Sequence, residues 1–374
     1  MHDLLAYLVR TSLDGEGDRI CQRSIATEVL GRDEDFDPES DAIVRAEMGR
    51  LRRKLTEYYA GDGQDDPIHI ELPRGSYQPL IHRDGSTDVP PLPRHEIRYC
   101  RADDGVSLAY SVVGRGYPLF LLPHWMSHLD HDFKTPLFRH FWEELPKRFT
   151  LIRFDLRGFG LSERDVHDFS LDRLVADLEC VAQAIGVTRA ALLGPSGGGP
   201  LGVAYAARYP DKVSHLALLG SFIRGPRRTG NPAAILHADA MQSCVRAGWG
   251  MEHSVFRKVF SAMLIPEGTT EQYQLIDEAQ FAAASAETAG RYQEMMSKFD
   301  LTQEAASVTC PTIVFHGVGE TVPLAEGQYA AAHIPGARLV PLETANHLLM
   351  PDEPAWPVFL SELTDFILAN ERRG

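Results

Sequence analysis

The residues best suited to chemistry lie at Gly194-Pro195-Ser196-Gly197-Gly198, where a serine has a glycine two positions away on each side. The apolar run 190–193 predicts a short buried strand before it, and the small residues 201–207 predict a helix after it. Strand and helix pass close together at so sharp a turn, so the flanking positions must lack side chains. The turn raises the serine Oγ above the strand end, beside a helix N-terminus, where it can act as a nucleophile.

A serine hydroxyl is a weak nucleophile unless a base takes its proton. His347, in a loop directly after a predicted strand, is the candidate base. A carboxylate must then hold the imidazole in one tautomer and stabilise its protonated form. We assign this role to Glu320, which follows another predicted strand; Asp352 and Glu343 are alternatives that lie closer to His347 in the sequence.

The negative oxygen that forms when a serine attacks a carbonyl needs fixed N–H donors. Gly197, directly after the nucleophile, offers one backbone N–H at the start of the predicted helix. We expect the second from the loop 123–128, where the backbone N–H of Trp125 is the candidate. The side chain of His124 is a further candidate donor to this oxygen.

Strand and helix patterns alternate from residue 95 onward, which predicts an α/β domain with a mostly parallel sheet and helices on both faces. The motifs follow the order of the α/β-hydrolase superfamily, which residues 95–370 resemble: the loop 123–128, the turn 155–162, the Ser196 elbow, an acid and a final histidine. The resemblance implies the α/β-hydrolase fold and a Ser-acid-His triad. The family usually has aspartate at Glu320 and glycine at His124, so both positions depart from its pattern.

About ninety residues, 222–307, interrupt the predicted core with a mostly helical pattern. In the resembled fold such an insertion forms a cap over the active site. Trp249 and Phe256 of the insertion, together with Trp125 and Met126, are predicted to line an apolar substrate pocket. This pocket favours a modest-sized ester, thioester or lactone with an apolar or aromatic part.

Residues 1–85 form a module of their own, in which three predicted helices and a hairpin indicate a winged helix-turn-helix. The segments 50–55 (Arg-Leu-Arg-Arg-Lys-Leu) and 72–77 (Leu-Pro-Arg-Gly-Ser-Tyr) resemble the recognition helix and wing of OmpR/PhoB-type effector domains. The resemblance implies that Arg45, Arg52 and Arg53 face DNA and that Arg74 contacts phosphate. The module is acidic, with 11 Lys and Arg against 18 Asp and Glu, so a role in dimerisation or docking is the alternative.

The remaining features of the sequence concern the domain boundaries, the partners that the net charge excludes, and the cellular compartment. A proline-rich linker, 86–94, separates the module from a core of 95–221 and 308–374 around the cap. The net charge of −15 argues against a general affinity for nucleic acid or anionic membranes, and neither a signal peptide nor a membrane-spanning run is predicted. Five scattered cysteines predict reduced thiols in a cytoplasmic protein, and no cofactor motif or metal-ligand spacing is recognised.

Two functions of different class follow from these patterns. The first is a serine hydrolase that cleaves a small ester, thioester or lactone through an acyl-enzyme. The second is a transcriptional regulator whose winged helix binds DNA, as a homodimer in the resembled family, and whose hydrolase-like domain senses a small molecule. The complete Ser196, Glu320 and His347 set favours the enzyme, whereas the arginine-rich third helix favours the regulator. A cofactor-free haloperoxidase-like side activity would use the same triad.

Overall fold

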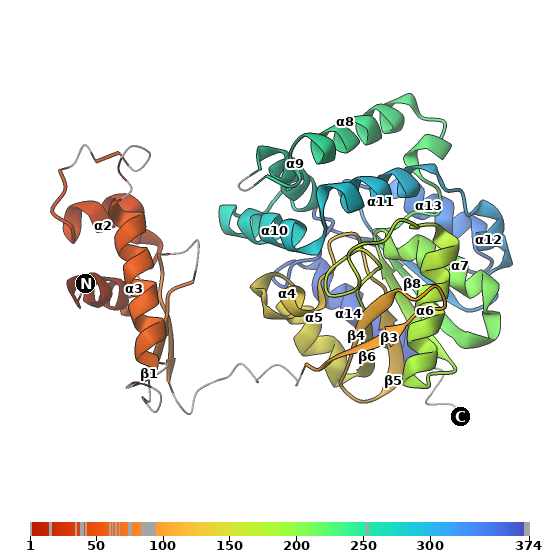
Figure 1. Cartoon of the computed structure of the whole chain (residues 1–374), viewed down its shortest axis with the longest axis horizontal. Coiled ribbons are helices and arrows are strands. Elements are labelled where there is room, and N and C mark those ends of the chain that lie inside the picture. Colours follow the sequence, from red (N-terminus) through yellow and green to blue (C-terminus); the bar gives the residue numbers. More distant parts are fainter. Residues whose placement is uncertain are drawn as a thin grey trace. The chain divides into compact units, whose positions relative to one another are not determined.

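In a computed structural model the chain divides into two units, Met1–Pro91 and Leu92–Gly374 (Figure 1). The structure describes residues 2–83 apart from 15–16, 34–35, 38–40, 42, 60, 62, 64–65, 67 and 74–76, and residues 95–369 apart from 252–253.

The described part of the first unit holds three α-helices followed by a two-stranded antiparallel sheet. The helices are α1 (His2–Leu13), α2 (Gln22–Glu28) and α3 (Ile43–Tyr59), and the strands are β1 (Ile68–Glu71) and β2 (Leu80–Arg83). Apolar side chains at helical spacing, Leu4 and Leu8 of α1 and Val44 and Met48 of α3, meet in a small core. The order of elements is the one expected from the sequence, and the winged-helix assignment stays a prediction.

Within the described residues of the second unit, eight strands form one sheet in the order β10-β9-β8-β7-β5-β6-β4-β3. The strands are β3 (Ile97–Arg101), β4 (Ser107–Val113), β5 (Tyr117–Leu121), β6 (Phe149–Phe154), β7 (Ala190–Pro195), β8 (Val213–Leu219), β9 (Thr312–Gly317) and β10 (Arg338–Leu342). Neighbours from β10 to β6 are parallel, whereas β4 and β3 join antiparallel as an opening hairpin. The predicted mostly parallel sheet is therefore confirmed.

Side chains alternate along the strands and fill a separate core on each face of the sheet. In β5, Phe120 points into one core, and its neighbours Leu119 and Leu121 point into the other. The first core is covered by α6 (Leu171–Ile185), α7 (Gly198–Arg208), α12 (Thr302–Ser307) and α13 (Leu324–His333). The second is covered by α5 (Arg139–Glu144) and α14 (Ala355–Leu368), with the short helix α4 (Leu129–Lys134) beside α5.

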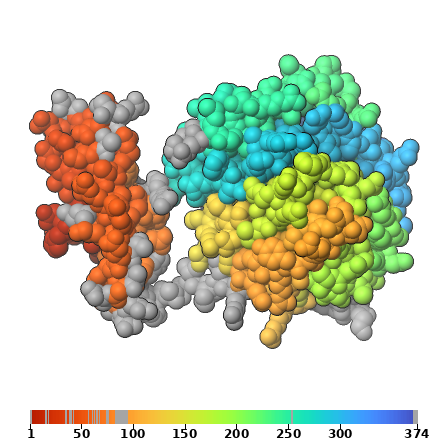
Figure 2. Space-filling model, in the orientation of Figure 1, coloured from red at the N-terminus to blue at the C-terminus, as the bar shows by residue number. Residues whose placement is uncertain are grey.

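The segment between β8 and β9 forms a cap, whose described residues contain four longer helices: α8 (Pro232–Gly248), α9 (Val255–Leu264), α10 (Thr270–Ala283) and α11 (Ala286–Lys298). These helices, green to turquoise in the pictures, form a layer along one side of the unit (Figures 1 and 2). Arg257 of α9 links this helix to α10 and to the segment after α8, because its buried guanidinium pairs with Asp277 at 2.9 Å and donates to the carbonyl oxygens of Trp249 and Met251. Among the described residues, none of the helices combines the length and apolar character that spanning a bilayer requires.

Candidate active site

Ser196 lies in the predicted sharp turn between β7 and α7. Its φ is +48°, and among the described residues it alone has a positive φ without being glycine. Ser196 N–H donates to the carbonyl of Leu219 at 2.8 Å, and the hydroxyl of Ser221 donates to the carbonyl of Ser196 at 2.7 Å. A Cβ on Gly194 would lie 2.7 Å from Cα of Gly199, so the close approach of strand and helix requires the glycine.

Glu320 and His347 come from the loops that follow β9 and β10, at the same edge of the sheet as Ser196. Nδ1 of His347 is hydrogen-bonded to Oε2 of Glu320, and both side chains are almost fully buried. The other carboxylate oxygen accepts the N–H of Gly317 at 2.9 Å, which fixes the longer glutamate side chain in place. A Cβ on Gly220 would lie 2.8 Å from this carboxylate, so the pair also needs a glycine beside it.

The two alternative acids do not take this position. Glu343 and Asp352 are exposed, and within the described residues neither forms a hydrogen bond or an ion pair with His347. Glu353, which sequence reasoning missed, instead braces the histidine loop, because its carboxylate accepts hydrogen bonds from Asn346 Nδ2 at 2.8 Å and Met350 N–H at 3.1 Å.

The cap also holds the histidine. His347 N–H donates to the carbonyl of Leu264, at the end of α9, at 2.7 Å. Ser196 and His347 line the same cavity, although within the described residues no hydrogen bond joins Ser196 Oγ to the imidazole. Catalytic hydrogen bonds are often long before a substrate binds, so the lack of a Ser196–His347 hydrogen bond is compatible with proton transfer between them.

Of the three candidate oxyanion donors, Gly197 follows Ser196 in the elbow and Trp125 lines the same cavity as Ser196, whereas His124 lines a smaller neighbouring cavity that does not include Ser196. Gly197 precedes the first turn of α7, and among the described residues nothing accepts a hydrogen bond from its N–H or from that of Trp125. His124 Nδ1 accepts the N–H of Met126 at 3.3 Å, which leaves the ring proton on Nε2. Burial, with smaller contributions from Arg153 and His347, lowers the pKa of His124 to about 3, so its ring is a neutral donor at physiological pH.

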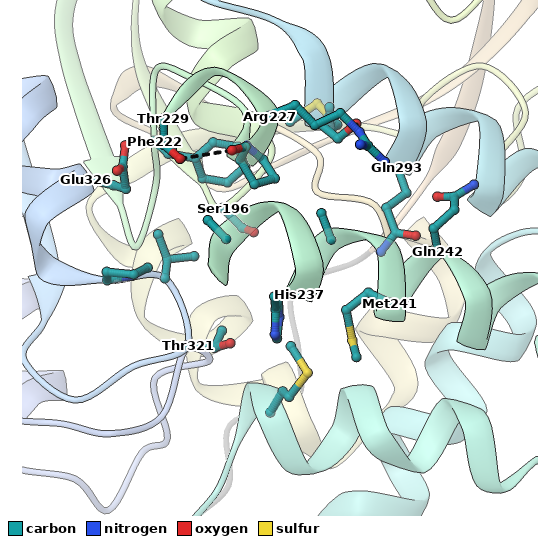
Figure 3. A pocket seen from close by; sticks show the side chains of 18 of the residues that line it. Ser196, Phe222, Arg227, Thr229, His237, Met241, Gln242, Gln293, Thr321 and Glu326 are labelled. Carbon is teal, nitrogen blue, oxygen red and sulfur yellow. Dashed lines mark hydrogen bonds between the residues drawn. The ribbon is translucent and has the colours of Figure 1, made fainter. Parts of the chain in front are cut away.

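A cavity of about 740 Å³ opens between the core and the cap above Ser196. Figure 3 labels Ser196 together with His237 and Met241 of α8 and with Thr321, all of which line this cavity. Other apolar lining residues are Trp125, Phe222, Phe260, Met263, Leu264, Met296 and Val322.

Of the four predicted pocket residues, Trp125 lines this cavity, whereas Met126, Trp249 and Phe256 do not. Met126 is 1% exposed and belongs to the core beneath the loop. Trp249 packs against Trp125 with the rings tilted and their centroids 4.8 Å apart, and its indole N–H donates to the carbonyl of Ala284. Phe256 packs against Gly248, away from the cavity. Apolar residues at helical spacing identify the buried face of a helix. They do not show whether that face packs in the core or lines the cavity.

The cavity is also more polar than predicted. Arg224 forms a two-pronged ion pair with Glu326 at 2.9 and 3.0 Å. Arg227 pairs with Asp239, and Gln242 and Gln293 reach the cavity from α8 and α11 (Figure 3). The Oε1 atom of Gln293 is buried and has no partner among the described residues.

The four predicted DNA-contacting arginines have different surroundings. Arg45 and Arg53 are exposed on α3. Arg52 donates to the carbonyl oxygens of Leu72 and Pro73, both at 2.9 Å, and so ties α3 to the segment after β1. Arg74 lies outside the described residues. DNA contact by these arginines stays a prediction.

Comparison with known proteins identifies the fold. Residues 119–249 match the family model of the alpha/beta hydrolase fold. The second unit has the α/β-hydrolase fold. The chain is 25% identical to the AB hydrolase superfamily protein YisY of Bacillus subtilis (strain 168) over 257 residues, which cover 67% of this chain and 91% of that protein.

Two solved structures support the same fold. The esterase EaEST from Exiguobacterium antarcticum matches with a TM-score of 0.61 and 21% identity, over 72% of this chain and 98% of that chain. The enol-lactonase from Burkholderia xenovorans LB400 matches with a TM-score of 0.59 and 22% identity, over 72% of this chain and 99% of that chain. At these identities the likeness establishes the α/β-hydrolase architecture alone.

Proposed function

We propose that the protein is a serine hydrolase that cleaves a carboxylic ester, thioester or lactone through an acyl-enzyme. The observation that carries this proposal is the buried Glu320–His347 pair, which opens onto the same cavity as the strained Ser196. The esterase and enol-lactonase among the structural neighbours support the reaction class. A serine nucleophile rather than a carboxylate makes an acyl-enzyme the intermediate.

In this mechanism His347 takes the proton of Ser196 as Oγ attacks the carbonyl carbon. Glu320 keeps the proton of His347 on Nδ1 and stabilises the imidazolium that forms. The backbone N–H groups of Gly197 and Trp125, with Nε2–H of His124, hold the oxyanion. His347 then protonates the leaving alcohol or thiol, and in the second half of the reaction it activates water to release the acid.

The cavity favours a small substrate with an apolar part and a polar end. Phe222, Phe260 and Met296 supply apolar walls in the cavity that contains the nucleophile. Gln242 and Gln293 offer amide groups in the same cavity, where a substrate oxygen or N–H could replace lost hydration. We therefore infer an ester with one hydrogen-bonding group beyond the scissile bond.

Labelling with a fluorophosphonate probe tests the proposal, because such probes phosphonylate only activated serines. Intact-mass measurement should show one adduct on the native protein and none on Ser196→Ala or on heat-denatured protein. Hydrolysis of p-nitrophenyl butyrate should disappear in the same variant. A folded native protein that takes up no probe and cleaves no ester would refute the proposed function.

A further inference from the structure

Another cavity, of about 60 Å³, lies beneath the loop that carries His124. It does not include Ser196, but His347 lines both this cavity and the large one. His347 therefore borders two distinct spaces, one between the core and the cap and one beneath the loop that carries His124.

The small cavity contains a buried ion pair. Arg153 Nη2 donates to Asp132 Oδ2 at 2.6 Å, with the two side chains 9% and 2% exposed. The same carboxylate oxygen accepts the N–H of His128 at 3.1 Å, and the guanidinium lies 3.9 Å from the centre of the Trp142 ring. These contacts fix both groups in place but do not use all of their hydrogen-bonding atoms.

Three buried polar atoms of residues lining this cavity have no protein partner within the described residues: Ser127 Oγ, Asp132 Oδ1 and Arg153 Nη1. An anion here would meet the free oxygen of Asp132, and a cation would meet the free nitrogen of Arg153. A small neutral molecule that both donates and accepts hydrogen bonds satisfies all three atoms. Water fits this description, and a molecule in the liquid occupies about 30 Å³, so the space suits a small cluster.

We propose that this cavity holds the water that hydrolyses the acyl-enzyme, an inference that rests on the proposed function. After acylation, the acyl group occupies the large cavity on the Ser196 side. Water from the small cavity reaches His347 without passing the acyl group. His347 takes one proton from this water, whose oxygen bonds to the acyl carbon; the bond between that carbon and Ser196 Oγ then breaks, the proton returns to Oγ, and the carboxylic acid leaves.

The test replaces the unpartnered hydroxyl by a larger apolar group in Ser127→Val. With p-nitrophenyl butyrate as substrate, we expect kcat and KM to fall together by about tenfold while kcat/KM stays within about twofold, the signature of slower deacylation. Acid-quenched intact mass should show the acyl-enzyme accumulating, and fluorophosphonate labelling should keep its rate. Ser127→Ala, which removes the hydroxyl without filling the space, should change kcat and KM in the same direction by less.

Ser214→Val is the matched control, since Ser214 is also buried with an unpartnered hydroxyl but lies near the start of β8, away from the site. It should leave kcat and KM unchanged. The inference is wrong if kcat/KM falls as far as kcat in both Ser127 variants, or if neither variant changes kcat. Failure of the native protein to label or to turn over would instead refute the proposed function.

Discussion

The core and the cap of the second unit contribute to the site in different ways. The core supplies Ser196, Glu320 and His347 from three loops at one edge of the sheet, held by backbone hydrogen bonds and by glycines that permit close approach. The cap supplies most of the cavity wall from helix faces, and it reaches the catalytic loop through the carbonyl of Leu264. In the proposed hydrolase, chemistry would depend on backbone geometry in the core, whereas substrate fit would depend on side-chain packing in the cap.

The largest expected effect comes from a substitution in the core. Glu320→Gln keeps the shape of the side chain but removes the charge that stabilises the protonated His347. We expect kcat for p-nitrophenyl butyrate to fall by about 10³- to 10⁴-fold, as for triad acids elsewhere. Glu343→Gln and Asp352→Asn, at the two exposed alternative acids, should stay near the native rate; a comparable loss in either would move the triad acid there.

The next effect concerns the stability of the cap. Arg257→Leu leaves Asp277 without its partner and frees two carbonyl oxygens, so it should lower the free energy of unfolding by about 3–5 kcal/mol. Urea denaturation measures the loss. Arg291→Leu, at an exposed ion pair with Glu287, should cost about 0–1 kcal/mol. Equal losses in the two variants would show that Arg257 does not hold the cap together.

The third prediction concerns the pH dependence of stability, which should respond to a buried histidine of the core and not to an exposed histidine of the cap. Burial in α5 lowers the pKa of His140 to about 4, whereas an unfolded histidine titrates near 6.5. The unfolded chain therefore binds this proton first, so the stabilisation is present above pH 6.5 and is lost as the pH falls toward 4. His140→Gln should flatten this loss by about 2–3 kcal/mol between pH 7 and 4.5 in urea titrations.

The matched control for that titration is His237→Gln, because His237 is exposed on the cap helix α8. Its pH profile of stability should overlay that of the native protein. Overlapping profiles for His140→Gln and the native protein would instead place the acid sensitivity in other groups.

The smallest expected effect tests whether the cap limits the length of the acyl chain that fits the cavity. Met241→Phe adds volume to the cavity wall, so it should reduce kcat/KM for p-nitrophenyl octanoate about tenfold relative to the butyrate. Leu236→Phe, on the exposed face of the same helix, should leave the ratio of the two esters unchanged. If both variants leave the ratio unchanged, the acyl chain does not lie along α8.

The sequence predicted those parts of the site that depend on the backbone. The glycines around Ser196 and the strand ends before Glu320 and His347 have local patterns, and the structure brings the last two residues into contact. Their catalytic roles stay predictions. The wall of the cavity was predicted poorly, because Trp249 and Met241 are both apolar residues of the cap, and only the packing of four helices decides which of them faces Ser196.

Polar contacts between segments that are distant in the sequence could not be predicted either. Nothing local in the sequence pairs Asp132 with Arg153 or aims Arg52 at the carbonyl of Leu72. Such contacts form when two elements, each of which can be predicted by itself, pack against each other in the folded chain. They can be found only after the topology is known.

The left-handed backbone of Ser196 has a consequence for engineering. A side chain in this conformation costs about 1–3 kcal/mol, and glycine would relieve much of it. Ser196→Gly should therefore tolerate more heat than the native protein while having lost its nucleophile. A laboratory selection for heat resistance alone would favour that inactive protein, so any selection on this fold has to score turnover and heat resistance together.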